Sequence, residues 1–186
     1  SDVCSSDLLW LPVPVLQRLS KVEHIIGLKE NTNNPMAFLN IIQGLDKEDI
    51  SIFAGLGHFM YQFMCFHGCT GFVTELLNYA PHLAVDLYHA GQKLDVDKVR
   101  ETADRINMFW NWVFRLAAKH SPIPSAVHPA CQLPNDMPYY QAANKAAAEL
   151  CGMPSGKARM PMENIPEEEI QELRGILKAM GCNVVK

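Results

Sequence analysis

Lys29 is the residue whose type and position in this sequence best suit covalent chemistry. It closes the run IIGLK at residues 25–29, which has the length and apolar character of a buried strand. Apolar neighbours make an amine harder to charge, and an uncharged amine can attack a ketone carbonyl to form an imine. A simpler interpretation is that the lysine only lets a strand end reach water. The sequence therefore offers Lys29 as a candidate nucleophile.

Two other groups of residues invite a chemical interpretation. Cys65, His67 and Cys69 lie close together, but no second ligand pair with zinc-like spacing follows them, so we predict no metal site. His58 is a candidate for contact with a substrate carboxylate, although we expect a histidine at the start of a helix to be exposed to solvent. Neither group points to a reaction by itself.

Strands and helices alternate in the part of the chain that contains Lys29. Short apolar runs at residues 25–29, 50–54 and 71–74 are predicted strands, and residues 35–44 and 58–67 are predicted helices between them. Apolar strands separated by helices indicate a parallel sheet that is covered on both faces. Lys29 would then lie at the carboxyl ends of the strands.

After Pro81 every predicted element is a helix or a loop. The helices cover residues 81–90, 95–119, 139–150 and 166–181, and the prolines between residues 122 and 138 break that stretch into short pieces. The second helix carries an apolar stripe for core packing: Val96, Val99, Ala103, Ile106, Trp110, Val113 and Ala117. Three further apolar residues broaden this surface, and they serve either core packing or a subunit contact: Phe109, Trp112 and Leu116.

The composition is that of a soluble globular protein. The chain has 186 residues, of which 48% are hydrophobic and 19% charged, with a net charge of −4. It has no basic block for nucleic acid, no apolar run of the ~20 residues that cross a membrane, and no signal-peptide pattern, so we expect a cytoplasmic protein. The six cysteines are expected to be reduced, buried thiols: Cys4, Cys65, Cys69, Cys131, Cys151 and Cys182.

Several segments resemble one enzyme family. Residues 25–32 (IIGLKENT) are similar to the signature around the catalytic lysine of the dihydrodipicolinate synthase and N-acetylneuraminate lyase family. The chain also has family-like segments at residues 53–55 (FAG), 71–74 (GFVT), 78–81 (NYAP) and 156–161 (GKARMP). The resemblance extends over roughly residues 12–180 with similar spacing.

This resemblance implies a (β/α)₈ barrel in which Lys29 is the Schiff-base lysine at the end of the sixth strand. It places Gly55 and Val73 in the pocket, where backbone atoms lie next to a bound oxo acid. Family members use the imine of pyruvate or another 2-oxo acid for aldol addition, cleavage or dehydration, with an aldehyde or sugar acid as the other reactant. It implies no metal and no organic cofactor, and a homo-oligomer, specifically a homotetramer.

The sequence departs from the family in two respects. Residues 55–58 read GLGH where many members have an acidic or amide residue after the pocket glycine. A (β/α)₈ barrel takes ~250 residues, and the family's tyrosine relay and Thr-Thr carboxylate site would precede residue 1. We therefore expect a fragment that is inactive in isolation. Glu30 should point away from Lys29 and serve a structural role, because side chains alternate along a strand.

The expected organisation has three parts. Residues 1–8 are a non-native leader, 9–91 form strands six to eight of a partial barrel, and 92–186 form a helical region packed on the barrel. Two alternatives remain open at this point. One is a non-catalytic helical interaction or regulatory domain, and the other, within the enzymes, is an N-acetylneuraminate lyase-like enzyme or a sugar-acid dehydratase.

Overall fold

The computed structural model describes residues 11–120, 139–160 and 162–185. The proline-rich stretch predicted between residues 122 and 138 lies outside them. The chain divides into two compact units, the first formed by Ser1–Thr74 with Leu87–Val99 and the second by Glu75–Asp86 with Arg100–Lys186. Within the described ranges, no helix combines the length and the apolarity needed to span a membrane.

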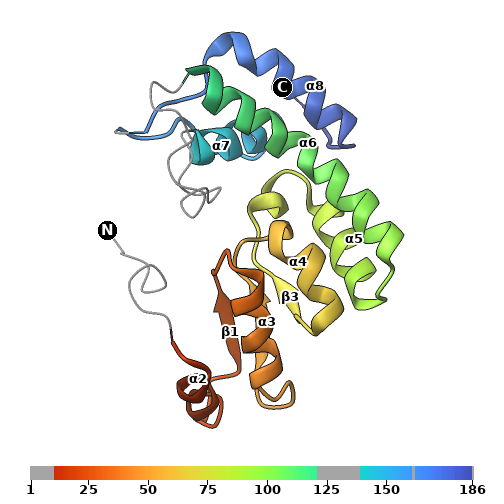
Figure 1. The fold of residues 1–186 in the computed structure, drawn as a ribbon. Coiled ribbons are helices and arrows are strands. Elements are labelled where there is room, and N and C mark those ends of the chain that lie inside the picture. Colours follow the sequence, from red (N-terminus) through yellow and green to blue (C-terminus); the bar gives the residue numbers. More distant parts are fainter. Residues whose placement is uncertain (1–10, 121–138, 161, 186) are drawn as a thin grey trace. The chain divides into compact units, whose positions relative to one another are not determined.

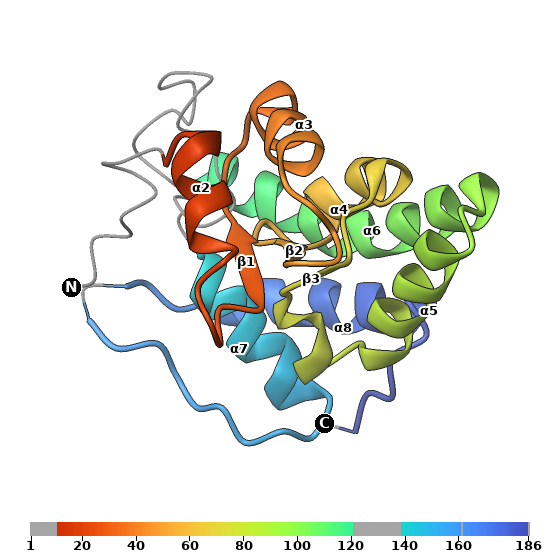
Figure 2. The same ribbon diagram turned by 90° about the horizontal axis from the view of Figure 1, so that it is seen from below.

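The first unit contains a three-stranded parallel sheet. Its strands are β1 (Gly27–Glu30), β2 (Ser51–Ala54) and β3 (Gly71–Phe72), with β2 in the middle (Figure 2). Both strand pairs are parallel, which confirms the predicted pairing, although β3 is shorter than the predicted strand. Since all three strands run the same way, their carboxyl ends meet at one edge of the sheet.

Helices cover one face of this sheet. Helices α3 (Pro35–Gly44) and α4 (His58–Met64) pack side by side against it (Figure 1), and the 3₁₀ turn η1 (Cys65–His67) extends α4. Ile52 and Ala54, on the covered face, are buried. Helix α3 begins where Asn34 Oδ1 accepts hydrogen bonds from two backbone N–H groups of the first turn, as expected for an N-cap followed by proline.

A further helix, α2 (Val13–Leu19), precedes the sheet and contacts α3. It is absent from the predicted elements because two prolines, Pro12 and Pro14, interrupt the sequence pattern there. Both stand at the start of the helix, where a missing N–H breaks no intrahelical hydrogen bond.

The second unit is helical. It contains the 3₁₀ turn η2 (Glu75–Asn78), α7 (Tyr140–Leu150), the 3₁₀ turn η5 (Glu167–Glu169) and α8 (Ile170–Ala179). It also contains the first half of α5 (Pro81–Gln92) and most of α6 (Val96–His120). As predicted, the described residues after Gly91 include no strand.

The apolar stripe of α6 is buried, with one exception. Six of its seven residues are at most 3% exposed: Val99, Ala103, Ile106, Trp110, Val113 and Ala117. The aromatic and leucine residues beside the stripe are also buried, as core packing predicts: Phe109, Trp112 and Leu116. The prediction for Val96 was wrong, since it is 59% exposed. It is the first residue of α6, so it lies at the helix end, beyond the packed part of the stripe.

A buried carboxylate joins the end of α6 to the start of α8. Glu169 is only 6% exposed, and its Oε1 accepts hydrogen bonds from Lys119 Nζ at 2.5 Å and His120 Nε2 at 3.0 Å. The hydrogen bond from Lys119, followed by that from His120, lowers the pKa of this carboxyl. Folding therefore favours the ionised form of Glu169.

Replacing Glu169 by glutamine should lower the stability of the chain at pH 7 and weaken its dependence on pH below neutrality. Because the folded pKa is depressed, the stabilisation is fully present above the unfolded value of about 4.3 and is lost as the pH falls through the folded value. Thermal unfolding measured from about pH 7 to pH 3 should show the two proteins converging at the acid end.

The Glu172→Gln variant is the matched control. Glu172 accepts a hydrogen bond from Arg115 Nη2 at 2.8 Å, but both side chains are largely exposed. Exposed ion pairs contribute little, so this variant should follow the parent protein at every pH. Identical pH profiles for the Glu169→Gln variant and the parent would contradict the assigned role.

Candidate functional site

Lys29 lies one residue before the carboxyl end of β1. Residues paired across neighbouring strands direct their side chains to the same face of a sheet. The register therefore groups five residues on the face of the lysine: Gly27, Lys29, Ser51, Phe53 and Gly71. This is the face opposite to the buried Ile52 and Ala54. Lys29 is exposed, so a dissolved ketone can reach its amine.

Phe53 is the large apolar side chain beside Lys29. The register pairs Phe53 with Lys29 on one side and with Gly71 on the other. A Cβ added at Gly27 would lie 3.3 Å from Phe53 Cε2, and one added at Gly71 would lie 3.2 Å from Phe53 Cδ1. The two glycines therefore make room for the ring, which gives the lysine an apolar neighbour. Sequence reasoning missed this role because it depends on the register between strands.

Gly55 and Val73 extend the strands at the same edge. The N–H of Gly55 donates to the Glu30 carbonyl at 2.7 Å, and the N–H of Val73 donates to the Ala54 carbonyl at 3.0 Å. Both N–H groups are thus used within the sheet, which leaves the carbonyl oxygens as the backbone groups of these residues that could face a bound molecule. Gly55 also has no room for a side chain, since an added Cβ would lie 1.6 Å from Asn31 Oδ1.

Glu30 holds the loop that follows the lysine strand. Its Oε1 accepts a hydrogen bond from the N–H of Thr32 at 2.7 Å, and Thr32 Oγ1 accepts one from the N–H of Asn34 at 3.2 Å. Asn34 in turn caps α3. These contacts agree with the predicted structural role of Glu30, which fixes the path from the catalytic candidate to the next helix.

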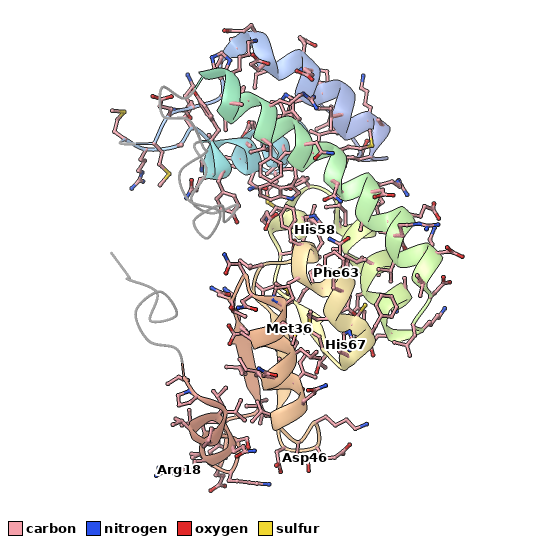
Figure 3. The ribbon with its side chains drawn as sticks, viewed as in Figure 1. Arg18, Met36, Asp46, His58, Phe63 and His67 are labelled. Carbon is pink, nitrogen blue, oxygen red and sulfur yellow. The ribbon has the colours of Figure 1, made fainter. Side chains whose placement is uncertain are left out.

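His58 is buried, which corrects the expectation of a solvent-exposed histidine. It is 1% exposed and begins α4 (Figure 3). The link between β2 and α4 consists of residues 55–57, so the first turn of the helix stays close to the sheet edge. Gly57 makes this tight link with a positive φ of 59°, next to the Val73 carbonyl and the Thr74 side chain.

The cysteines near the end of α4 are engaged with backbone groups. Cys65 Sγ contacts the Gln62 carbonyl at 3.9 Å, and Cys69 Sγ contacts the carbonyls of Ile52 and Gly71 at 3.3 and 3.2 Å. Burial raises the pKa of the Cys65 thiol to about 11 and also raises that of Cys69. The part of the chain that the structure describes holds no cluster of three or more histidine, cysteine or acidic side chains suited to a metal ion.

A cavity of about 480 Å³ lies at the opposite edge of the sheet from Lys29. Its lining includes Ile50 and Thr70, which precede β2 and β3, and Asp46, Lys47 and His67. Figure 3 shows His67 at the other end of the α4 region from His58. Ligands of parallel sheets bind outside the carboxyl ends of the strands. Strand direction therefore favours the Lys29 edge over this cavity as the place where a ligand binds.

Comparison with known proteins identifies a family and several relatives. Residues 9–141 match the model of the dihydrodipicolinate synthetase family. The 4-hydroxy-tetrahydrodipicolinate synthase of Archaeoglobus fulgidus is 25% identical over 166 residues, which cover 89% of this chain and 49% of that protein. The enzyme of the same name from Neisseria meningitidis is 27% identical over 164 residues, with 88% and 48% covered. The chain thus spans about half the length of these relatives.

Solved structures of similar proteins share the fold. Dihydrodipicolinate synthase from Oceanobacillus iheyensis superposes with a TM-score of 0.71 at 20% identity, covering 92% of this chain and 51% of that one. YagE, a prophage protein of the dihydrodipicolinic acid synthase family from E. coli K12 in complex with pyruvate, gives 0.66 at 18% identity, with 92% and 51% covered. At these identities the likeness establishes the fold alone.

Replacing Gly55 by alanine should destabilise the chain by about 1–3 kcal/mol. The Asn31 side chain can rotate away from an added methyl group, but the Glu30 carbonyl, 2.9 Å from the Cβ position, belongs to the sheet backbone. Urea unfolding of the chain measures the loss.

The control is Gly175→Ala in α8, where an added Cβ meets no atom within 4 Å. It should be neutral or stabilise the chain by up to about 1 kcal/mol, because alanine favours helix more than glycine does. Equal stability of the Gly55→Ala variant and the parent would show that the close approach of Asn31 and Glu30 to Gly55 is not a constraint.

Proposed function

This chain belongs to the dihydrodipicolinate synthetase family, and we propose that it is the carboxy-terminal part of a lysine Schiff-base aldolase or lyase. In this proposal β1, β2 and β3 are strands six to eight of a (β/α)₈ barrel. Residues 9–91 supply this part of the barrel, and residues 92–186 supply a helical region. The observation that carries the proposal is the position of Lys29 beside Phe53 at the carboxyl end of a parallel strand.

Lys29 is proposed to act as the covalent catalyst. Its uncharged amine attacks the C2 carbonyl of a 2-oxo acid, a carbon–nitrogen bond forms, and water leaves to give an imine. The protonated imine then withdraws electrons from the adjacent carbon, so that a carbon–carbon bond can be made or broken at that carbon, or a carbon–oxygen bond can be broken at the next one. Phe53, paired with Lys29 across the sheet, supplies an apolar wall beside the amine.

The remaining proton transfers need groups from elsewhere in the barrel. Lys29 is the only titratable residue among the five that share its sheet face. Residues 55–57 follow β2 at the same edge of the sheet as Lys29, and they are glycine, leucine and glycine, which also cannot transfer protons. General acid–base help typically contributes about 10²- to 10⁴-fold to such reactions. We therefore propose that the chain is inactive by itself and that the preceding strands complete the active site.

The proposed substrate is pyruvate or another 2-oxo acid, together with an aldehyde or a sugar acid. Pyruvate bound to YagE, a structural neighbour, and the synthase names of the relatives support this class. The imine mechanism needs no metal or organic cofactor, because the lysine itself provides the electron sink. We further propose a cytoplasmic homotetramer that binds neither nucleic acid nor membrane.

Treatment of the complete protein with pyruvate and borohydride should attach one reduced pyruvate to Lys29. Lys29→Ala should abolish both this adduct and turnover, whereas Lys47→Ala should change neither, because Lys47 lines the cavity at the other edge of the sheet. Peptide mass spectrometry locates the adduct, and circular dichroism verifies that each variant is folded.

The isolated 186-residue chain, assayed in parallel, should show no turnover. Robust turnover by this chain would mean that the active site does not depend on the missing strands. A folded complete protein that forms no adduct with any 2-oxo acid would instead support a non-catalytic helical interaction or regulatory domain. Turnover of sugar acids rather than addition of pyruvate to an aldehyde would assign the chain to the lyase or dehydratase branch.

A further inference from the structure

Two cysteines far apart in the sequence meet in the second unit. Cys151 follows the last residue of α7, and Cys182 follows the turn that ends α8. The structure has no disulfide between them, and each thiol influences the pKa of the other, so the two side chains lie close together. Neither residue has a role in the proposed lysine chemistry.

The backbone around each thiol fixes its position. The N–H of Cys151 donates to the carbonyls of Ala147 and Ala148, each at 3.1 Å, as the last turn of α7 closes. The N–H of Cys182 donates to the Leu177 carbonyl at 2.9 Å. Gly181 permits this return with a φ of 83°, a value that L side chains rarely adopt. Both cysteines are therefore held by helix ends rather than by free loops.

The segment after Cys182 runs along the end of α7. The N–H of Val185 donates to the Leu150 carbonyl at 2.9 Å. A Cβ added at Gly152 would lie 2.9 Å from Val185 Cγ2, so glycine is needed for the close approach of the two segments. These contacts on either side of Cys151 hold the segment that follows Cys182 against the end of α7.

We propose that Cys151 and Cys182 form a dithiol site that low-molecular-weight disulfides, such as glutathione disulfide, oxidise to an intramolecular disulfide. In the first step a thiolate of the protein attacks the disulfide, forms a mixed disulfide and releases one thiol. In the second step the other protein thiolate attacks the mixed disulfide and releases a second thiol. One low-molecular-weight disulfide is thereby reduced to two thiols while two protein thiols become one disulfide.

The exposure of the two thiols sets the order of attack. Cys151 is half-buried, whereas Cys182 is 8% exposed, so the external disulfide meets Cys151 first and Cys182 then resolves the mixed disulfide. Burial raises the pKa of both thiols, that of Cys182 to about 12, while the Arg105 guanidinium acts in the opposite direction on Cys182. A small thiolate fraction makes the exchange slow at neutral pH without preventing it.

The other two cysteines that the structure describes as free provide an internal comparison. Cys65 and Cys69 are also buried and lie only four residues apart, but each thiol is directed to backbone carbonyls. Proximity in the sequence therefore favours a disulfide between Cys65 and Cys69, whereas the structure favours a disulfide between Cys151 and Cys182. An oxidation experiment on the same sample distinguishes the two pairings.

The test is to equilibrate the folded 186-residue chain with glutathione disulfide, block the remaining thiols, and map the peptides by mass spectrometry. The expected product is one peptide pair joined through Cys151 and Cys182, with two hydrogens lost, while Cys65 and Cys69 are recovered alkylated. The bridge should raise the thermal midpoint of the chain by about 5 °C, and reduction should reverse the shift.

Single variants separate the proposed order from accidental oxidation. Cys182→Ser should stop the reaction at a glutathione adduct on Cys151, and Cys151→Ser should leave Cys182 as a free thiol. Cys65→Ser is the matched control and should leave bridge formation unchanged. The proposal is overturned if the folded parent chain gives no Cys151–Cys182 peptide, if it accumulates a stable glutathione adduct, or if Cys65 and Cys69 oxidise first.

Discussion

The parallel register that pairs Lys29 with Phe53, and Phe53 with Gly71, is the constraint on which the site depends. A shift of one residue in β1 would turn the lysine to the opposite face of the sheet, because side chains alternate along a strand. The same shift would separate the lysine from the aromatic ring. The register thus determines whether the amine lies beside the ring on one face of the sheet.

Small residues keep this register and open the site. Gly27 and Gly71 leave space for the Phe53 ring, and Gly55 lets Asn31 approach the end of β2. Beyond the edge, Gly57 turns the chain tightly enough to begin α4 beside the sheet. Glycines at these points allow close backbone approach, and the large apolar residues are kept for the covered face and for Phe53. Glycine therefore occurs at the points of this site where a ring or a backbone segment approaches closely.

The sequence predicted the strand and helix order because periodicity and helix caps are local signals. For residues 35–44 the local signal was a cap followed by proline, and for the stripe from Val99 to Ala117 apolar spacing decided both the element and its buried side. Features that depend on tertiary contacts were not predictable in this way. The burial of His58 follows from the shortness of the link at residues 55–57, and the role of Phe53 follows from the register between the strands. The meeting of Cys151 and Cys182 arises from the return of the chain after α8.

In the proposed chemistry, Lys29 is the residue at which this protein binds a 2-oxo acid covalently. The most direct measurement is a crystal structure of the complete protein soaked with pyruvate. Covalent binding at Lys29 predicts continuous electron density from Lys29 Nζ to the C2 atom of pyruvate, with Phe53 and the backbone of Gly55 beside the bound group. Density for pyruvate at the Asp46 and His67 cavity, or on a different lysine, with Lys29 unmodified, would contradict it.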